Sequence, residues 1–504
     1  MNQKRTGIII SYLNLLLGMV VNVFLTPFLI STLGDVDYSL YKVMQSLAGP
    51  LSMFNLGIST IVARSVVRHN NVIDYSEKDK QNTMALALLA SCIMSVFVIV
   101  AGLFVYQFIP EFYGDKYTDT EVDTGGKLFV IFLISTVLHM LTDAFSGCIV
   151  GHERFVVNSS IPLIKTVLKI LLLVVLLKSG MGVVAVVTVD LVLAMVVFLF
   201  TAGYAVLVLR EIPKLYCFDK KQIIEILSFG AAILLQAFVN QINNNVDTVI
   251  LGGTINEKSI ITMYSSALAV YAIYNSMISV ITNFFLPKAT KLVSQSASGK
   301  ELTDFVIPPG RFQAIVAVGC ICCFALFGKN FITIWIGEKY LNAYWVILML
   351  IVPVTIPLVE NAVISILDAS MKRTFRSVVL VIMAILNVIV SIILVDFIGF
   401  WGVALGTVLS LVVGHGILMN IYYAKTFNME IVRMFFSIFK GILPAGIAAS
   451  LLCVPLSLFL NNTFFLFLLK CVSFVLLYGI FLWLFGINDD EKKSLKKIFE
   501  KRQH

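Results

Sequence analysis

Charge is scarce in this chain, and familiar catalytic motifs are missing from it. Only 13% of the 504 residues are charged, whereas about 25% are charged in a typical soluble domain. The sequence contains no GxxxxGK[ST] phosphate-binding loop, no HExxH zinc motif and no GxSxG nucleophile motif. These absences exclude an ordinary soluble protein and argue against nucleotide hydrolysis, zinc-dependent proteolysis and serine hydrolysis. We expect no cofactor and no metal.

Long apolar runs fill most of the chain instead, and 59% of the residues are hydrophobic. A helix needs about 20 apolar residues to cross the hydrocarbon core of a bilayer, and we count fourteen such runs. The first is too long for the core of a signal peptide and has no small-residue cleavage site after it. The sequence therefore predicts an all-α membrane protein with about 14 transmembrane helices. The predicted spans are 7–33, 38–63, 83–109, 127–150, 156–177, 182–209, 223–251, 260–286, 306–334, 343–367, 377–396, 402–424, 441–460 and 464–486.

Lysine and arginine gather in alternate loops. With the N-terminus inside, the inner segments hold 26 of them, the outer segments 6 and the spans five, which accounts for all 37. Because positively charged loops stay in the cytoplasm, this bias predicts cytoplasmic N- and C-termini. The net charge of +8 is thus an orientation signal, and we expect no nucleic acid as a partner. The basic tail is expected to contact anionic membrane lipids.

The two halves of the chain repeat each other. Phe155 and Gly182 begin two consecutive spans, Phe375 and Gly402 begin their counterparts, and both pairs are 27 residues apart. Six spans in each half insert both halves the same way up, related by a pseudo-two-fold axis along the membrane normal. The expected parts are an N-lobe at 1–210, a C-lobe at 223–424, two additional helices at 437–487 and a basic cytoplasmic tail at 488–504.

Amide side chains at helical spacing predict a polar face in two of the spans. Amides are common as hydrogen-bonding contacts between membrane helices, and they also suit a substrate cavity between two lobes. We favour the cavity. The faces consist of Asn14 and Asn22 in the first span, and of Gln236, Asn240, Asn243 and Asp247 in the seventh.

Two lysines lie deep in the fifth span. At 1.5 Å per residue, Lys165 and Lys169 are roughly 15 and 21 Å from the start of that helix. Snorkelling to the headgroups, which we expect for Lys42, Lys470 and Arg311 near span ends, is much harder from this depth. Because the two are four residues apart, they share a helix face and repel each other. They need negative charge beside them.

Two sources of that negative charge are open. Asp143 and Asp190 lie at similar depths in the neighbouring spans and could form buried ion pairs with the lysines. Alternatively, the phosphates of a lipid headgroup could be held by both ammonium groups in a wet, positively charged cavity. The eight cysteines are expected as buried thiols, and His139 and His415 as packing residues.

The chain resembles a known family along about 480 residues. The stretch NVFLTPFLISTLGDVDYSLYKVMQSLAGPLSMFNLGISTIVAR is similar to the start of bacterial polysaccharide flippases of the O-antigen and teichoic-acid type. This stretch contains the LG…Y and LGI…R elements that are common in those proteins. The segments GHERF, NNVDTVILGG and FITIWIGEKYLNAYWV fit the same family. The family belongs to the multidrug/oligosaccharidyl-lipid/polysaccharide exporter superfamily. The matching residues are Leu33, Gly34, Tyr41, Leu56, Gly57, Ile58 and Arg64.

The resemblance implies a flippase, not an enzyme. It implies that the protein moves undecaprenyl-pyrophosphate-linked oligosaccharide units from the inner to the outer leaflet of the bacterial cytoplasmic membrane by alternating access. In that interpretation Lys165 and Lys169 meet the pyrophosphate and the amide faces meet the sugars. The polysaccharide polymerase machinery is a candidate partner, and an ion gradient or consumption of product supplies the energy.

Two other functions remain open. An ion-coupled multidrug exporter of the same superfamily would bind cations, and Asp143, Asp190, Asp247 and Glu360 are acids that could pair with them or with a coupling ion. A membrane enzyme such as a glycan polymerase needs a large outer loop with catalytic groups, and the longest outer loop, PEFYGDKYTDTEVDTGG, has no histidine or arginine.

Overall fold

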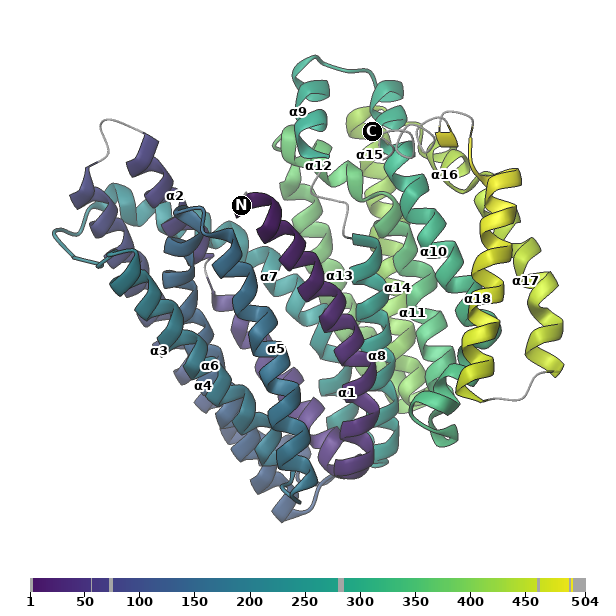
Figure 1. The fold of residues 1–504 in the computed structure, drawn as a ribbon, viewed down its shortest axis with the longest axis horizontal. Helices are drawn as coiled ribbons and strands as arrows, with labels where there is room; N and C mark the ends of the chain where they lie inside the picture. The colour runs from purple at the N-terminus through teal and green to yellow at the C-terminus, as the bar shows by residue number, and fades with distance from the viewer. Residues whose placement is uncertain are drawn as a thin grey trace. The chain divides into compact units, whose positions relative to one another are not determined.

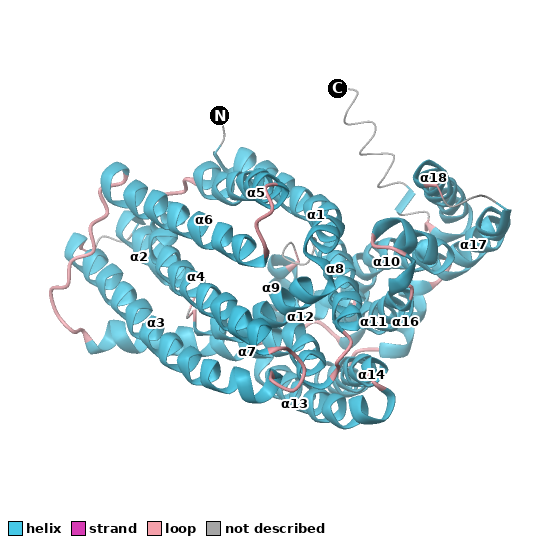
Figure 2. Ribbon diagram, turned by 90° about the horizontal axis from the view of Figure 1, so that it is seen from below, coloured by secondary structure: helices cyan, strands magenta, loops and turns pink. Residues whose placement is uncertain are grey.

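The computed structural model describes residues 3–55, 57–71, 76–279, 285–459, 463–488 and 491–492. Within these residues every regular element is a helix, and most connections are short (Figure 2). The chain divides into two compact units, Met1–Ser265 and Ser266–His504. These units have other bounds than the N-lobe (1–210) and the C-lobe (223–424) expected from the internal repeat. The division into these lobes stays a prediction.

Eleven helical stretches of the described residues are long and apolar enough to cross a membrane. The first, Ile9–Asn70, covers the first two predicted spans. α7 (Lys220–Thr254) and α8 (Lys258–Ser279) lie at the seventh and eighth predicted spans and are not among the eleven. The prediction of an all-α membrane protein is confirmed, and the expected 14 spans are compatible with these helices.

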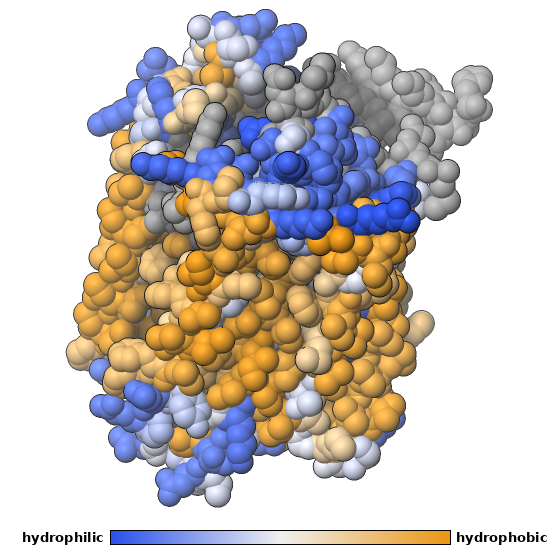
Figure 3. Space-filling model, turned by 90° about the vertical axis from the view of Figure 1, so that its left-hand side faces the viewer, coloured by the Kyte–Doolittle hydropathy of each residue, from blue (hydrophilic) through white to orange (hydrophobic). Residues whose placement is uncertain are grey.

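A band of apolar surface lies between two polar edges on one face of the molecule (Figure 3). Large apolar side chains are exposed along the helices, such as Phe104, which is 63% exposed, and Leu451, which is 68% exposed. In water this surface would be unfavourable by about 25 cal/mol per Å². In a bilayer it contacts lipid tails, so the protein is a multi-pass membrane protein.

In the first unit α4 occupies the centre and packs against α1, α2, α3, α5 and α6 (Figure 1). α3 and α4 both begin with a capping box, in which Ser76 and Thr118 pair with the residues three positions later. Such caps satisfy the first amide groups of a helix. The elements are α1 (Gln3–Ala48), η1 (Gly49–Phe54), α2 (Ile58–Asn71), α3 (Glu77–Tyr113), α4 (Asp119–Gly151), α5 (Phe155–Lys178), α6 (Val183–Gly203), the π-helical turn η2 (Tyr204–Val208), α7, and the start of α8.

The second predicted span, 38–63, is interrupted. α1 kinks at Gly34, whose φ of 75° suits glycine, and continues to Ala48, where the 3-10 turn η1 takes over. Pro50 at the start of that turn has no amide hydrogen for a helical bond. The turn places Asn55 beside α4, where its side chain donates to Asp143.

In the second unit α10 packs against α11, α16, α17 and α18, and α13 packs along α14. The tenth predicted span, 343–367, is also interrupted, because α11 ends at Val359 and α12 begins at Asn361. The elements are α9 (Leu286–Ser294), α10 (Gly299–Trp335), η4 (Glu338–Tyr340), α11 (Asn342–Val359), α12 (Asn361–Ala369), α13 (Arg373–Ile398), α14 (Phe400–Leu411), the π-helical turn η5 (Val412–Met419), α15 (Asn420–Phe427), α16 (Ile431–Phe439), α17 (Ile442–Phe459), α18 (Phe464–Phe481) and the π-helical turn η6 (Leu482–Gly486).

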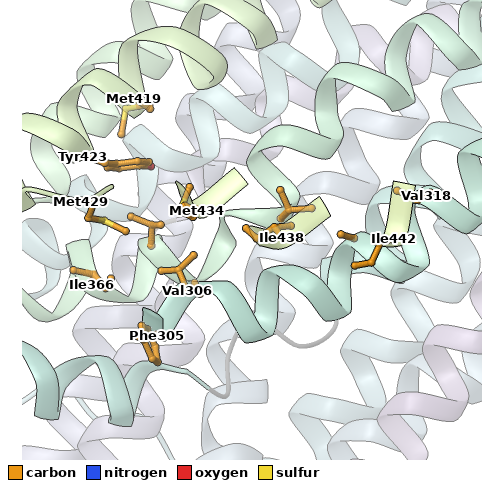
Figure 4. Close-up of a cluster of buried hydrophobic side chains, with 14 of the residues drawn as sticks. Phe305, Val306, Val318, Ile366, Met419, Tyr423, Met429, Met434, Ile438 and Ile442 are labelled. Carbon is orange, nitrogen blue, oxygen red and sulfur yellow. The ribbon is translucent and has the colours of Figure 1, made fainter. Parts of the chain in front are cut away.

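The short helix α16 lies in a segment that the sequence analysis treated as a loop. Its Met434 and Ile438 are fully buried in the core of the second unit (Figure 4). On the other side Val432 is 86% exposed and Phe436 is 69% exposed. Nine residues are too few to cross a bilayer, so a search for spans misses this amphipathic helix.

Candidate functional site

The two lysines of α5 have different partners. Lys169 Nζ lies 2.8 Å from Oδ1 and 2.9 Å from Oδ2 of Asp190 in α6. Lys165 Nζ lies 3.3 Å from Nε2 of His139 in α4. An ammonium group has only hydrogens to donate, so the imidazole accepts from Lys165. Asp190 thus neutralises one lysine, and the contact with His139 leaves the charge of Lys165 in place.

Asp143 does not reach Lys165 in this structure. It lies on α4 one turn beyond His139, and its carboxylate accepts a hydrogen bond from Asn55 in the segment after η1. The interruption of the second predicted span brings Asn55 to this position. Of the two ion pairs considered from sequence, only the one between Lys169 and Asp190 is formed.

A third lysine joins this group. Lys42 in α1 lies within electrostatic range of Lys169 and Asp190, and its Nζ is 5.3 Å from the ring centre of Tyr41. It also donates a 3.4 Å hydrogen bond to Gln45. The sequence analysis placed Lys42 at a span end as a snorkelling residue. Its electrostatic contact with Lys169 of α5 and Asp190 of α6 instead places it among the helices of the first unit.

The lysine cluster, which we define as Lys42, Lys165 and Lys169 with Asp190 and His139, has an excess of positive charge. Lys42 and Lys165 each lie within electrostatic range of Lys169 and Asp190, so three lysines accompany one aspartate. The side chains of Lys169 and Asp190 keep 25% and 18% of their exposure. A partly exposed cationic cluster inside membrane helices is costly unless an anion or water compensates it. Its chemistry suits the binding of a phosphate or carboxylate.

The predicted amide faces differ in exposure. Asn22 and Asn240 are exposed and Asn14 is half-buried, and their place in a cavity stays a prediction. Asn243 is half-buried, and its Oδ1 is buried with no hydrogen-bond partner among the described residues. The side chain of Gln236 lies outside the part of the chain that the structure describes.

Asp247, at the end of the same predicted face, is 1% exposed and accepts a 2.7 Å hydrogen bond from Tyr264 in α8. It is therefore held inside the first unit. Polar contacts that the sequence analysis missed link α7 to η1, where Gln241 donates to Ser52 at 2.9 Å and Asn245 donates to Gln241 at 2.8 Å.

Glu360, at the junction of α11 and α12, is 2% exposed. Both of its carboxyl oxygens are buried without a hydrogen-bond partner among the described residues. It lies in the second unit, and the residues that interact with it, Asn420 and Arg376, do not belong to the lysine cluster. Elsewhere in the described residues, no group of three or more histidine, cysteine, aspartate or glutamate side chains is arranged to hold a metal ion.

Solved structures with this fold are membrane transporters and flippases. A lipid II flippase MurJ in an inward closed conformation matches with a TM-score of 0.72 at 16% identity, covering 94% of this chain and 97% of that one. An inward-facing multidrug resistance MATE family transporter of the MOP superfamily matches with a TM-score of 0.65 at 14% identity, covering 85% and 98%. An outward-facing MATE transporter matches at 0.54 and 14%, covering 86% and 97%.

These likenesses define the class of fold, that of a multi-pass membrane transporter of the MurJ and MATE type. The family follows from the sequence. The chain belongs to the family of polysaccharide biosynthesis proteins, whose sequence model matches residues 6–293, and the resemblance described above is confirmed. No curated protein matches the chain.

Proposed function

We propose that this protein is a flippase that moves undecaprenyl-pyrophosphate-linked oligosaccharide units from the inner to the outer leaflet of the bacterial cytoplasmic membrane. The lysine cluster is the observation that carries the proposal. Its excess positive charge inside membrane helices matches the doubly charged pyrophosphate of such a substrate. Membership of the polysaccharide biosynthesis family and the flippase-type fold support it.

In this proposal Lys165 and Lys42 hold the pyrophosphate, and Lys169 joins them while Asp190 keeps it oriented. Charge-assisted hydrogen bonds to phosphate contribute about 1.5–3 kcal/mol each. The exposed amides Asn22 and Asn240, with Asn14 and Asn243, offer donors and acceptors to the sugar hydroxyls. The polyprenyl tail stays in the hydrocarbon core throughout, so the protein needs no binding site for it.

The proposed cycle is alternating access between the N-lobe (1–210) and the C-lobe (223–424), with substrate bound between them. Because the sequence has no nucleotide-binding loop, an ion gradient or consumption of product drives the direction. Polymerase machinery at the outer leaflet would remove the product. We place the N- and C-termini in the cytoplasm, from the bias of lysine and arginine among the loops.

The MATE-like fold makes a multidrug exporter the second candidate. Such a protein would bind cations, and a cluster of three lysines and one aspartate repels them. Of the acids that could attract a cation in the first unit, Asp190 is paired with Lys169, Asp247 is buried against Tyr264, and Asp143 accepts a hydrogen bond from Asn55. The charge of the described site therefore favours an anionic substrate.

Genetic complementation tests the proposal. Expression of this chain in a strain that lacks its lipid-linked oligosaccharide flippase should restore surface polysaccharide, measured by gel analysis of the exported polymer. Export that stays absent despite correct membrane insertion would contradict the proposal. Resistance to cationic drugs gained in the same strain would favour the multidrug exporter.

The orientation gives a separate prediction. Single cysteines placed at 115–123, in a background without the native cysteines, should react with a membrane-impermeant maleimide added to intact cells. Cysteines at 76–80, at the start of α3, should react only after the membrane is opened. The opposite labelling pattern would invert the topology and with it the proposed direction of transport.

A further inference from the structure

The junction between α11 and α12 holds a carboxyl group in an unusual state. Glu360 interrupts the tenth predicted span, is 2% exposed, and has no hydrogen-bond partner for either carboxyl oxygen among the described residues. An ionised carboxylate buried without donors or a cation is strongly unfavourable, whereas the neutral acid is tolerated and can itself donate a hydrogen bond.

Backbone geometry keeps Glu360 in this place. Pro353 and Pro357 lie within α11 and remove two amide donors from its last turns. The amide of Glu360 still bonds to Ile356 at 3.4 Å, and its carbonyl accepts from Val363 in α12 at 2.8 Å. The backbone groups of Glu360 are therefore hydrogen-bonded at the junction, and its two carboxyl oxygens are the groups without a partner among the described residues.

Asn420 at the start of α15 lies beside this carboxyl group. Its Nδ2 donates to the carbonyl of His415 at 3.0 Å and to the carbonyl of Gly416 at 3.3 Å. Its Oδ1 is buried without a partner among the described residues. Because Asn420 lies within hydrogen-bonding reach of Glu360, a proton on the carboxyl group can pair with this unpaired oxygen.

The charged and titratable groups around Glu360 come from three neighbouring elements. Arg376 in α13 acts on Glu360, on His415 in η5 and on Tyr423 in α15. The arginine also forms a hydrogen bond with Tyr423. A fixed positive charge of this kind disfavours a metal cation at the site and attracts Glu360 whenever it is ionised.

We propose that Glu360 is a proton-binding site whose protonation is coupled to transport. The proton comes from water and forms the O–H bond of the neutral acid, which donates to Oδ1 of Asn420. Release of the proton returns a carboxylate that is drawn towards Arg376 instead. The two states exchange partners between α15 and α13 across the break in the tenth span, and a break of this kind can bend.

Infrared difference spectroscopy of the full-length protein in lipid nanodiscs tests proton binding directly. Between mildly acidic and mildly alkaline buffer, the wild type should show a protonated-carboxyl C=O band that is absent in Glu360→Gln. Asp247→Asn is the matched control, because Asp247 is a buried carboxylate with a donor in Tyr264, and this variant should keep the band. A band that persists in Glu360→Gln would overturn the proposal.

A second variant keeps the test valid if Glu360→Gln does not fold. Asn420→Leu removes the proposed acceptor and should shift the C=O band of Glu360 to higher frequency, as expected for a carboxyl group without a hydrogen bond. A band of unchanged frequency in this variant would contradict the pairing of Glu360 with Asn420.

Coupling is tested in proteoliposomes, and this part alone rests on the proposed flippase function. The probe is lipid-linked oligosaccharide extracted from a flippase-deficient strain. Each unit of pH difference across the membrane can shift its distribution between leaflets by up to about tenfold in the wild type, and by none in Glu360→Gln. A response to a sodium gradient in place of a pH gradient would overturn proton coupling. Absence of any flipping would contradict the proposed function, and the infrared band would still test Glu360.

Discussion

Polysaccharide export should be lost when Lys165 and Lys169 are both replaced by glutamine, while the protein still inserts and folds. Each lysine is expected to contribute about 1.5–3 kcal/mol to the binding of a pyrophosphate. Loss of two such contacts weakens binding by at least about a hundredfold. The measurement is the amount of surface polysaccharide in a flippase-deficient strain, together with the amount of folded protein in its membranes.

The single variants separate substrate binding from internal charge pairing. Lys165→Gln removes a lysine whose contact in the structure is His139, so its loss leaves no carboxylate without a partner. Lys169→Gln leaves Asp190 behind in a partly buried site, and Lys169→Gln with Asp190→Asn removes both charges of that pair. If the lysines bind substrate, export falls in Lys165→Gln. It also stays low in the double variant Lys169→Gln with Asp190→Asn, although that variant leaves no unpaired charge.

Lys127→Gln is the matched control. Lys127 forms an exposed pair with Asp123 on the same helix, and their side chains are 62% and 63% exposed. Such pairs contribute about 0–1 kcal/mol, so export and stability should be unchanged. Normal export by the variant with Lys165, Lys169 and Asp190 all neutral would show that these charges only balance each other, and would contradict the substrate site.

Replacement of Arg311 should produce the largest loss of stability. Its side chain is 2% exposed, and its guanidinium contacts Glu491 at 2.8 Å. It also donates to the carbonyls of Ser437 at 2.7 Å and Lys440 at 3.1 Å, and to that of Gly486. Arg311→Gln leaves these acceptors without their donor, and removal of one partner from a buried charged network costs about 3–5 kcal/mol.

Thermal unfolding of the purified protein in detergent measures this effect. Arg433→Gln serves as the control, because Arg433 pairs with Asp304 and Glu430 where its side chain is 41% exposed. We expect a change of at most about 1 kcal/mol there. Equal unfolding temperatures for Arg311→Gln and the wild type would show that the buried network does not stabilise the contacts of α10 with residues 437, 440, 486 and 491.

Arg311 also shows where the sequence analysis was wrong. We expected Arg311 and Lys470 to snorkel from span ends to the headgroups, yet their residues are 2% and 0% exposed. Hydropathy measures only the transfer of a residue between water and lipid. It contains no information about the carbonyl groups that another part of the chain brings to a buried arginine, so this kind of site is found only when the fold is known.

The membrane helices themselves could be predicted, because their length follows from bilayer thickness and their apolar composition. The breaks at Pro50 and Glu360 were missed, since a window of about 19 residues averages over a single proline or acid. These breaks matter for the site. The break at Pro50 brings Asn55 to Asp143, and Lys165 contacts His139 instead. Depth along the helix alone could not tell whether Lys165 contacts Asp143 or His139.

Lys42 could have been found from the sequence by a local signal. Tyr38 precedes it by four residues and Tyr41 by one, and its Nζ lies 5.6 Å and 5.3 Å from their ring centres. Cation–π contacts of this kind hold a lysine inside a helix bundle. Its proximity to Lys169 depends on the packing of α1 against α5, which no local pattern contains.

Reconstitution of the purified protein into liposomes tests the central claim most directly. The liposomes contain lipid-linked oligosaccharide from a flippase-deficient strain, and an impermeant glycosidase added outside reports the fraction in the outer leaflet. The account predicts that the wild type brings nearly all of the substrate to the enzyme, and that Lys165→Gln with Lys169→Gln leaves the inner-leaflet half protected. Protection of that half in wild-type liposomes, with transport of a cationic dye in the same vesicles, would contradict it.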